Sequence, residues 1–246
     1  MKLFLTCQAC ISESGIDDVR FYAAEVLDER IANFKCLKGH STSTIVQLEK
    51  HEILSEIAIN AIIDGYYREA VSSFTASLER FYELYLRTVF ADKQLDDVEF
   101  DEPWKLVKKQ SERQFGAFLF LYVLEEGKSP PCLSKRSIAF RNRVIHEGLI
   151  PTRDEAIGYG QGVLDVITPV MNALVLQKKD TLQNNLFRNL SAAYENSPSE
   201  SQFSSTAKWP TLMDWSRTEG QEQPTVQEWL IHIEKMRPGF RSKAVS

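Results

Sequence analysis

The spacing of hydrophobic residues changes near residue 50, and this change divides the chain. Before it, apolar and polar residues alternate in short runs rich in β-branched and aromatic residues, as in half-buried β-strands. The pattern predicts strands at about residues 2–6, 19–23, 33–35 and 42–48. So small a β module rarely buries enough apolar surface to fold alone, and we expect a bound metal ion to stabilise it.

After residue 50, apolar residues recur every three or four positions, as on the buried face of an amphipathic helix. The pattern predicts helices at about residues 51–64, 67–90, 104–124, 133–147 and 154–190. Asp101-Glu102-Pro103 is the expected start of the third helix, because acidic residues and proline favour a first turn. A bend is expected in the fifth helix near Pro169. The sequence therefore predicts a mainly α protein, a helical bundle with a small N-terminal β module.

The C-terminal stretch has a different composition. Residues 196–208 are rich in serine and predict a linker, and residues 224–236 predict a short amphipathic helix. Three of the four tryptophans lie here, at Trp209, Trp215 and Trp229. Such aromatic density indicates a docking segment, with the bundle as the expected surface and a partner protein as the alternative. The expected domains are residues 1–48, 49–192 and 193–246.

Composition and charge narrow the class of protein. Of the 246 residues, 43% are hydrophobic and 26% are charged, which suits a chain with a packed core. No apolar run is long enough for a membrane span and no leader pattern begins the chain, so we expect a cytoplasmic protein. The net charge of −5, from 29 basic and 34 acidic residues, argues against a surface that binds a phosphate backbone throughout. It leaves room for one confined basic cleft.

Three of the four cysteines lie in the first 36 residues. Cys7-Gln-Ala-Cys10 forms one close pair, and Cys36 is followed by His40 in a turn that contains Gly39. Thiolates and imidazole are the ligands that Zn²⁺ prefers, and four of them close a structural site. We therefore predict that Cys7, Cys10, Cys36 and His40 bind a structural Zn²⁺. The alternative is that they are small buried residues clustered by chance.

The N-terminal module resembles the zinc-ribbon family over about the first 45 residues. The resemblance rests on the two short ligand pairs and on the Gly-His turn of the second pair. It implies a structural metal without an open coordination position. His51 falls outside this pattern and is expected to begin a helix.

One segment of the predicted bundle carries candidate chemistry. Residues 139–148 read AFRNRVIHEG, with Arg141, Asn142 and His146 near the end of the fourth helix. This segment resembles the HEPN superfamily (higher eukaryotes and prokaryotes nucleotide-binding domain), whose signature is Arg-x(4–6)-His with a polar residue after the arginine. The resemblance covers about residues 50–192 and implies a HEPN-like helical bundle.

The residue types suit chemistry on a phosphate. Asn142 and His146 are i,i+4 neighbours, so the amide is expected to orient the imidazole. Arg141 carries a fork of donors that matches a phosphate, and His146 lies at the negative end of the helix dipole, which favours its protonated form. Residues 128–153 contain six basic residues and one acidic residue. The alternative interpretation is a solvated basic face ending in an ordinary C-cap histidine.

The HEPN resemblance implies a metal-independent endoribonuclease, in a toxin or antiviral-defence setting, that cleaves RNA by attack of its own 2′-hydroxyl. It also implies a homodimer with Arg141, Asn142 and His146 from each chain in a shared cleft, and an inhibitory or antitoxin partner protein is a further expectation. No metal is expected in catalysis. Two alternatives remain, namely a non-catalytic nucleic-acid-binding or sensing adaptor and a module that only oligomerises. No glycine-rich phosphate loop or His-Glu-x-x-His motif indicates another enzyme, and Cys132 has no histidine nearby in sequence to activate it.

Overall fold

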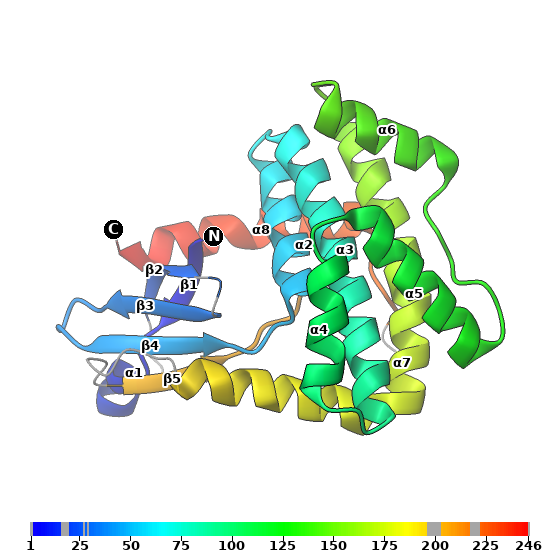
Figure 1. Cartoon of the computed structure of the whole chain (residues 1–246). Coiled ribbons are helices and arrows are strands. Elements are labelled where there is room, and N and C mark those ends of the chain that lie inside the picture. Colours follow the sequence, from blue (N-terminus) through cyan, green and yellow to red (C-terminus); the bar gives the residue numbers. More distant parts are fainter. Residues whose placement is uncertain are drawn as a thin grey trace. The chain divides into compact units, whose positions relative to one another are not determined.

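A computed structural model describes residues 2–15, 20–26, 28, 30–195, 203–216 and 222–245 (Figure 1). The chain forms two compact units. The first unit comprises Met1–Leu48, Leu186–Pro210 and Ile231–Ser246, and the second comprises Glu49–Asn185 and Thr211–Leu230. The prediction of a mainly α protein with a small N-terminal β module is confirmed. Among the described residues, none of the helices combines the length and apolar character needed to cross a bilayer.

The first unit is built on a sheet whose described strands run in the order β1-β2-β3-β4-β5, with β6 also paired to β2. The four N-terminal strands pair antiparallel in sequence order, as β1 (Lys2–Thr6), β2 (Phe21–Val26), β3 (Ile31–Lys35) and β4 (Ser41–Val46). A short helix, α1 (Gln8–Ser14), follows β1. The last strand, β6 (Ala244–Val245), pairs parallel with β2. All four predicted N-terminal strands are therefore present.

Part of the predicted serine-rich linker is a strand instead. Residues 203–207 form β5 (Phe203–Ala207), which pairs parallel with β4. Because β4 is itself rich in hydroxyl side chains, the two strands match chemically, and the hydroxyls of Thr44 and Ser205 are 2.9 Å apart. A serine-rich segment can thus join a sheet when a hydroxyl-lined neighbour satisfies it. Residues 196–202 of the predicted linker lie outside the described residues.

Small hydrophobic clusters hold this sheet. Leu5, Ala24 and Ala32 are buried together, and Trp209 packs against them. A second cluster joins Ile31 and Ile45 to Ala193. The first predicted docking tryptophan therefore packs within the β unit.

The second unit is helical and centres on α3 (Tyr67–Asp92). Its side chains Phe74, Phe81 and Tyr85 are completely or almost completely buried, and α2 (Lys50–Ile63) packs along it. His51 lies in the first turn of α2, as predicted, and is buried. Further helices are α6 (Lys135–His146) and α7 (Arg153–Glu195).

The third predicted helix, at residues 104–124, is wrong. The structure has two helices there, α4 (Asp97–Val107) and α5 (Ser111–Glu126), and Pro103 lies inside α4 rather than at its start. The break is stabilised by Gln114, whose buried side chain donates to the carbonyl of Lys108 at 2.7 Å and accepts from Arg80 at 3.0 Å. Gln114 thus satisfies an orphan carbonyl at the end of α4.

The bend in α7 lies at Lys178, and not near Pro169 as predicted. Lys178 has non-helical backbone angles of φ −135° and ψ 32°. Its mostly buried ammonium pairs with Asp92 and lies 3.2 Å from a carboxylate oxygen of Glu125. The helix bends where two acids hold a lysine, whereas Pro169 is accommodated by an otherwise regular helix.

The C-terminal stretch packs on the helical unit through polar contacts with α2. The Trp229 indole in α8 (Val226–Lys243) donates to the Glu56 carboxylate at 2.9 Å, and the Leu212 backbone N–H donates to the same oxygen at 2.8 Å. The Thr211 hydroxyl donates to Glu52 at 3.1 Å. For Trp229, the predicted docking onto the bundle is confirmed.

Candidate functional site

The four predicted metal ligands come from two short turns of the first unit. Cys7 is the N-cap of α1 and Cys10 lies in its first turn, where the backbone N–H of Ile11 donates to the carbonyl of Cys7 at 3.1 Å. Cys36 and His40 flank the turn between β3 and β4, and Gly39 takes the positive φ of 89° that this turn requires. Two backbone hydrogen bonds close the turn, from the Cys36 N–H to the His40 carbonyl at 3.1 Å and from the Gly39 N–H to the Cys36 carbonyl at 2.9 Å.

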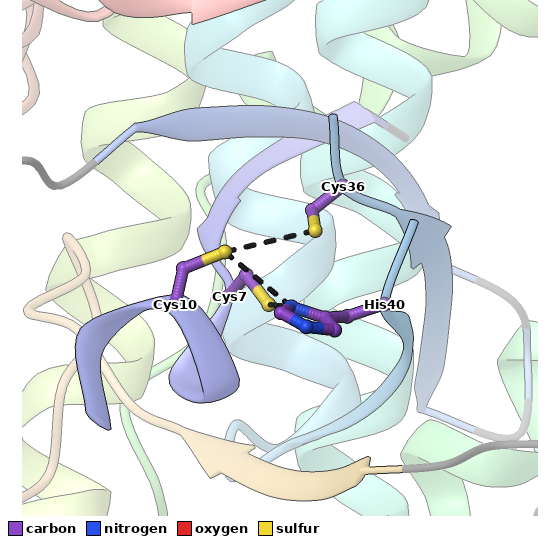
Figure 2. A group of neighbouring side chains, drawn as sticks. All are labelled: Cys7, Cys10, Cys36 and His40. Atoms are coloured by element: carbon purple, nitrogen blue, oxygen red, sulfur yellow. Dashed lines mark hydrogen bonds between the residues drawn. The ribbon is translucent and has the colours of Figure 1, made fainter. Parts of the chain in front are cut away.

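The four side chains converge on one point (Figure 2). The Cys10 Sγ lies 3.7 Å from the Cys36 Sγ and 3.5 Å from the His40 Nδ1, and the Cys7 Sγ lies 3.7 Å from the same nitrogen. All four ligand atoms lie within 4.8 Å of one another. The cluster is therefore positioned to hold a metal ion.

Two further side chains orient the ligands. The His40 Nε2 lies 3.2 Å from a carboxylate oxygen of Glu13, so the ring turns Nδ1 toward the sulfurs. The Thr42 hydroxyl lies 3.6 Å from the Cys7 Sγ. A carboxylate behind a ligating histidine is the usual outer partner in metal sites, because it fixes the tautomer and the ring orientation.

The pKa values of two of the ligand thiols are shifted in opposite directions. Burial opposes ionisation of Cys7, but the backbone N–H of Cys10 and the side chains of Thr42 and His40 outweigh it and lower the pKa of Cys7 to about 7. Burial and the neighbouring sulfurs of Cys36 and Cys7 raise the pKa of Cys10 to about 12. A divalent cation removes this conflict, because it stabilises all of the thiolates together.

The second predicted group, Arg141, Asn142 and His146, lies on α6. Ser134 caps the start of this helix by accepting the Ser137 backbone N–H at 3.0 Å. The helix ends after His146, and Gly148 takes a φ of 75° while the Leu149 N–H donates to the Arg143 carbonyl at 3.1 Å. This ending leaves His146 exposed on the last turn.

Arg141 points to a different environment from His146. Its Nη1 donates to the Asn142 Oδ1 at 2.9 Å. Burial raises the pKa of the Tyr159 hydroxyl, and the nearby charge of Arg141 opposes that rise. The Tyr159 hydroxyl in turn lies 2.8 Å from the Thr75 Oγ1. In the structure, the Asn142 carbonyl oxygen therefore accepts from Arg141, whereas the sequence suggested that the amide orients His146.

An acidic side chain faces this arginine. Burial raises the pKa of Glu79 on α3, while the nearby charges of Arg80 and Arg141 oppose that rise. Arg141 is thus close enough to both Glu79 and Tyr159 for its charge to act on them, and the residue is half-buried. Helix α6 therefore carries one arginine, Arg141, that is held by Asn142, and one exposed histidine, His146.

Comparisons of this chain with protein-family models, with curated proteins and with solved structures found no match. The likeness to the zinc ribbon therefore stands on the Cys3His cluster, and the likeness to HEPN stands on the Arg141–His146 sequence motif of α6.

Several residues at these sites carried little signal in the sequence. Glu13 lies three residues after Cys10, and that spacing on a short helix was the one available indication that it reaches the ligands. Thr42 lies in a run of residues that is typical of any strand, so the sequence did not indicate its contact with Cys7. Tyr159 and Glu79 belong to other helices, and only their packing brings them to Arg141.

Proposed function

We propose that this protein is an RNA-cleaving, HEPN-like endoribonuclease that needs no metal for catalysis, with a structural Zn²⁺ in its N-terminal module. The observation that carries the proposal is the α6 motif, which offers an anchored arginine and an exposed histidine on a basic helix. A toxin or antiviral-defence role, with an inhibitory or antitoxin partner, follows from the resemblance to HEPN.

The charge around α6 supports RNA as the substrate. Six basic residues and one acidic residue lie between positions 128 and 153, in a chain whose net charge is −5. The arginines of α6 are exposed or half-exposed. A confined positive surface on an acidic protein favours a phosphate ligand over general adsorption.

The chemistry needs three functions. A base takes the proton of the RNA 2′-hydroxyl, whose oxygen then attacks the adjacent phosphorus. The bond from phosphorus to the 5′-oxygen breaks, and an acid supplies that oxygen with a proton, leaving a 2′,3′-cyclic phosphate and a 5′-hydroxyl. Arg141 neutralises the phosphate as its charge develops, and His146 serves as the proton donor.

Two copies of the chain supply the missing base. Arg141 is turned toward Tyr159, and His146 stands on the exposed last turn of α6. In a homodimer with two α6 helices facing one RNA, one His146 accepts the proton and the other donates it. This shared arrangement is what the HEPN resemblance implies.

The donor set and its dimensions favour Zn²⁺ as the ion. A tetrahedral zinc with bonds of about 2.3 Å to sulfur and about 2.0 Å to nitrogen separates two sulfurs by about 3.8 Å and a sulfur from a nitrogen by about 3.6 Å. The observed separations are 3.7 Å between the sulfurs of Cys10 and Cys36 and 3.5 Å from Cys10 to His40. Four protein ligands fill the shell, which supports a structural role.

Product analysis tests the function. Purified protein is incubated with end-labelled RNA in EDTA, alongside the same RNA with 2′-O-methyl groups. The expected result is cleavage of the first RNA to 2′,3′-cyclic phosphate and 5′-hydroxyl ends, and binding without cleavage of the second. Products with 5′-phosphate ends, or cleavage that requires Mg²⁺, contradict the proposal.

A nucleic-acid-binding adaptor is the second candidate. The observation that favours it is the engagement of Arg141 by Asn142 and Tyr159, which suits a residue that holds phosphate or structure without turnover. Stable RNA binding with no cleavage by the unmodified protein would support this second function.

A further inference from the structure

A cavity of about 150 Å³ lies directly beside the metal ligands in the first unit. The side chains of Cys7 and Cys10 form part of its lining, together with the basic residues Arg20 and Lys38. A cavity of this volume holds one six-membered ring, since an engineered cavity of the same size in another protein binds benzene. The pocket is therefore large enough for one small planar group.

Apolar surfaces complete the lining. Ile11 and Leu37 contribute aliphatic side chains, and Tyr22 contributes an aromatic one. Tyr22 is buried and stacks on Phe34 with ring centroids 5.4 Å apart, so this wall is rigid. Flat apolar walls favour a ring over a flexible chain, because bases and aromatic rings stack with little loss of conformational entropy.

The metal ligands determine which ring fits. Three thiolates and a neutral imidazole would leave a net charge of −1 around a divalent ion, and two of those ligands, Cys7 and Cys10, line the cavity. A carboxylate entering beside them is repelled, whereas a neutral ring whose edge carries N–H groups can donate hydrogen bonds to sulfur. The ligand side of the pocket therefore favours a neutral nucleobase with an amino group over a carboxylate.

The two cations supply a position for a phosphate. Arg20 and Lys38 are both exposed to solvent while lining the cavity. Lys38 is held in place, since its ammonium donates to the Ser14 hydroxyl at 2.8 Å and lies 3.4 Å from Glu13. A guanidinium and an ammonium beside a ring-sized pocket match a base and its own phosphate.

We propose that this pocket binds one cytidine nucleotide of single-stranded RNA, with the base against Tyr22 and Leu37 and its phosphate on Arg20 and Lys38. Cytosine presents its 4-amino group to the ligand side of the pocket, whereas uracil, of equal size, has a carbonyl oxygen at that position and can donate only through its ring N3–H. The proposal deepens the proposed function, because it names the element that selects the RNA, but the binding itself does not require cleavage.

The test measures RNA binding in the His146→Ala background, so that cleavage does not enter. Fluorescence anisotropy follows the zinc-loaded full chain with labelled single-stranded C8 and U8 RNA over a salt series. We expect tighter binding of C8. Arg20→Ala should weaken binding of both RNAs at least fivefold and lower the salt slope by about 0.7, the value for one phosphate contact on a single strand.

Two variants separate the pocket from general charge. Lys35→Ala removes an exposed cation of β3 outside the cavity lining and should change affinity less than twofold. Leu37→Ala should weaken binding of both C8 and U8 without changing the salt slope. Zinc content is measured for each variant, and unaltered zinc in Arg20→Ala assigns its effect to the pocket.

Some results would overturn the proposal. Equal affinity for C8 and U8, equal effects of Arg20→Ala and Lys35→Ala, or displacement of RNA by an octaglutamate peptide would each do so. Loss of binding in Arg141→Ala but not in Arg20→Ala would place the RNA on α6 alone and leave the proposed function standing. If the unmodified protein never cuts RNA but still binds it through this pocket, the proposed function is wrong and the proposed binding site stands.

Discussion

At the scale of single residues, the carboxyl of Glu52 shows how strongly burial changes a side chain. It accepts hydrogen bonds from the Glu49 backbone N–H at 2.7 Å and from the Thr211 hydroxyl. Burial raises the pKa of Glu52 to about 8, with the negative charges of Asp214 and Glu49 adding to the rise and the two hydrogen bonds opposing it. The folded state therefore favours the protonated acid.

This shift predicts how stability depends on pH. Because the unfolded carboxyl titrates near its ordinary pKa of about 4.3, the folded state binds the extra proton between there and about pH 8. Stability should fall as pH rises through this range, by up to about 1.4 kcal/mol per pH unit. Glu52→Gln, which keeps the uncharged shape, should flatten the dependence.

Urea denaturation of the helical signal at pH 5, 6, 7 and 8 measures this effect. Glu69→Gln on the exposed side of α3 is the control and should leave the slope as in the unmodified protein. An unchanged slope in Glu52→Gln would contradict the assignment of this carboxyl.

Residue substitution also tests the metal centre. Metal analysis should find one zinc per chain. Cys36→Ala removes one of the clustered sulfurs, so it should release the ion and unfold the N-terminal sheet, while the helical signal persists. Cys132→Ala, at an exposed thiol outside the cluster, should retain the ion. Full zinc occupancy in Cys36→Ala would exclude Cys36 as a ligand.

At the scale of elements, the contact between α3 and α7 depends on a missing side chain. A Cβ atom at Gly160 of α7 would lie 2.4 Å from a ring carbon of Phe74, which is completely buried on α3. A Cβ at Gly158, two residues earlier, would meet nothing within 4 Å. The contact with α3 therefore requires a glycine at position 160 but not at position 158, although the two glycines have similar neighbours in the sequence.

Alanine at these two positions should have opposite effects. Gly160→Ala should destabilise the helical unit by about 1–3 kcal/mol, because it overpacks a filled core. Gly158→Ala should stabilise it by up to about 1 kcal/mol through helix propensity. Denaturant titration of both variants gives the two free energies of unfolding, and equal values would contradict the close approach.

Elements also show what the sequence could predict. Long periodic helices and the two ligand pairs were recognisable because their signals are local, in apolar spacing and in the Cys-x-x-Cys turn. The break between α4 and α5 depends on Gln114, and the kink of α7 on the acids around Lys178. Those partners are distant in sequence, so no local pattern could indicate them.

At the scale of the whole molecule, the sequence did not predict all of the strands in the sheet. Strand β5 joins β4 across more than 150 residues, and its serine-rich composition alone indicated a linker. The positions of Tyr159 and Glu79 near Arg141 likewise follow from tertiary packing. The grouping of Cys7, Cys10, Cys36 and His40 was predictable because the short spacing within each pair and the ligand chemistry are visible in the sequence.

The proposed ribonuclease predicts a property of the assembled protein. Light scattering should give about twice the chain mass of 28.2 kDa at micromolar concentration, because one chain offers one His146 and the reaction needs a base and an acid. Adding an excess of His146→Ala chains to the unmodified protein should then lower its cleavage rate, because a mixed dimer holds only one His146. A monomer that cleaves RNA would contradict the shared site.

The most direct measurement compares RNA cleavage by His146→Ala, by His232→Ala and by the unmodified protein. His232 is an exposed histidine of α8 and serves as the matched control. The proposed function predicts that His146→Ala lowers the cleavage rate about 100-fold or more with its helical signal intact, in line with loss of a proton donor. His232→Ala should cleave as the unmodified protein does. Undiminished cleavage in His146→Ala would contradict the proposed function.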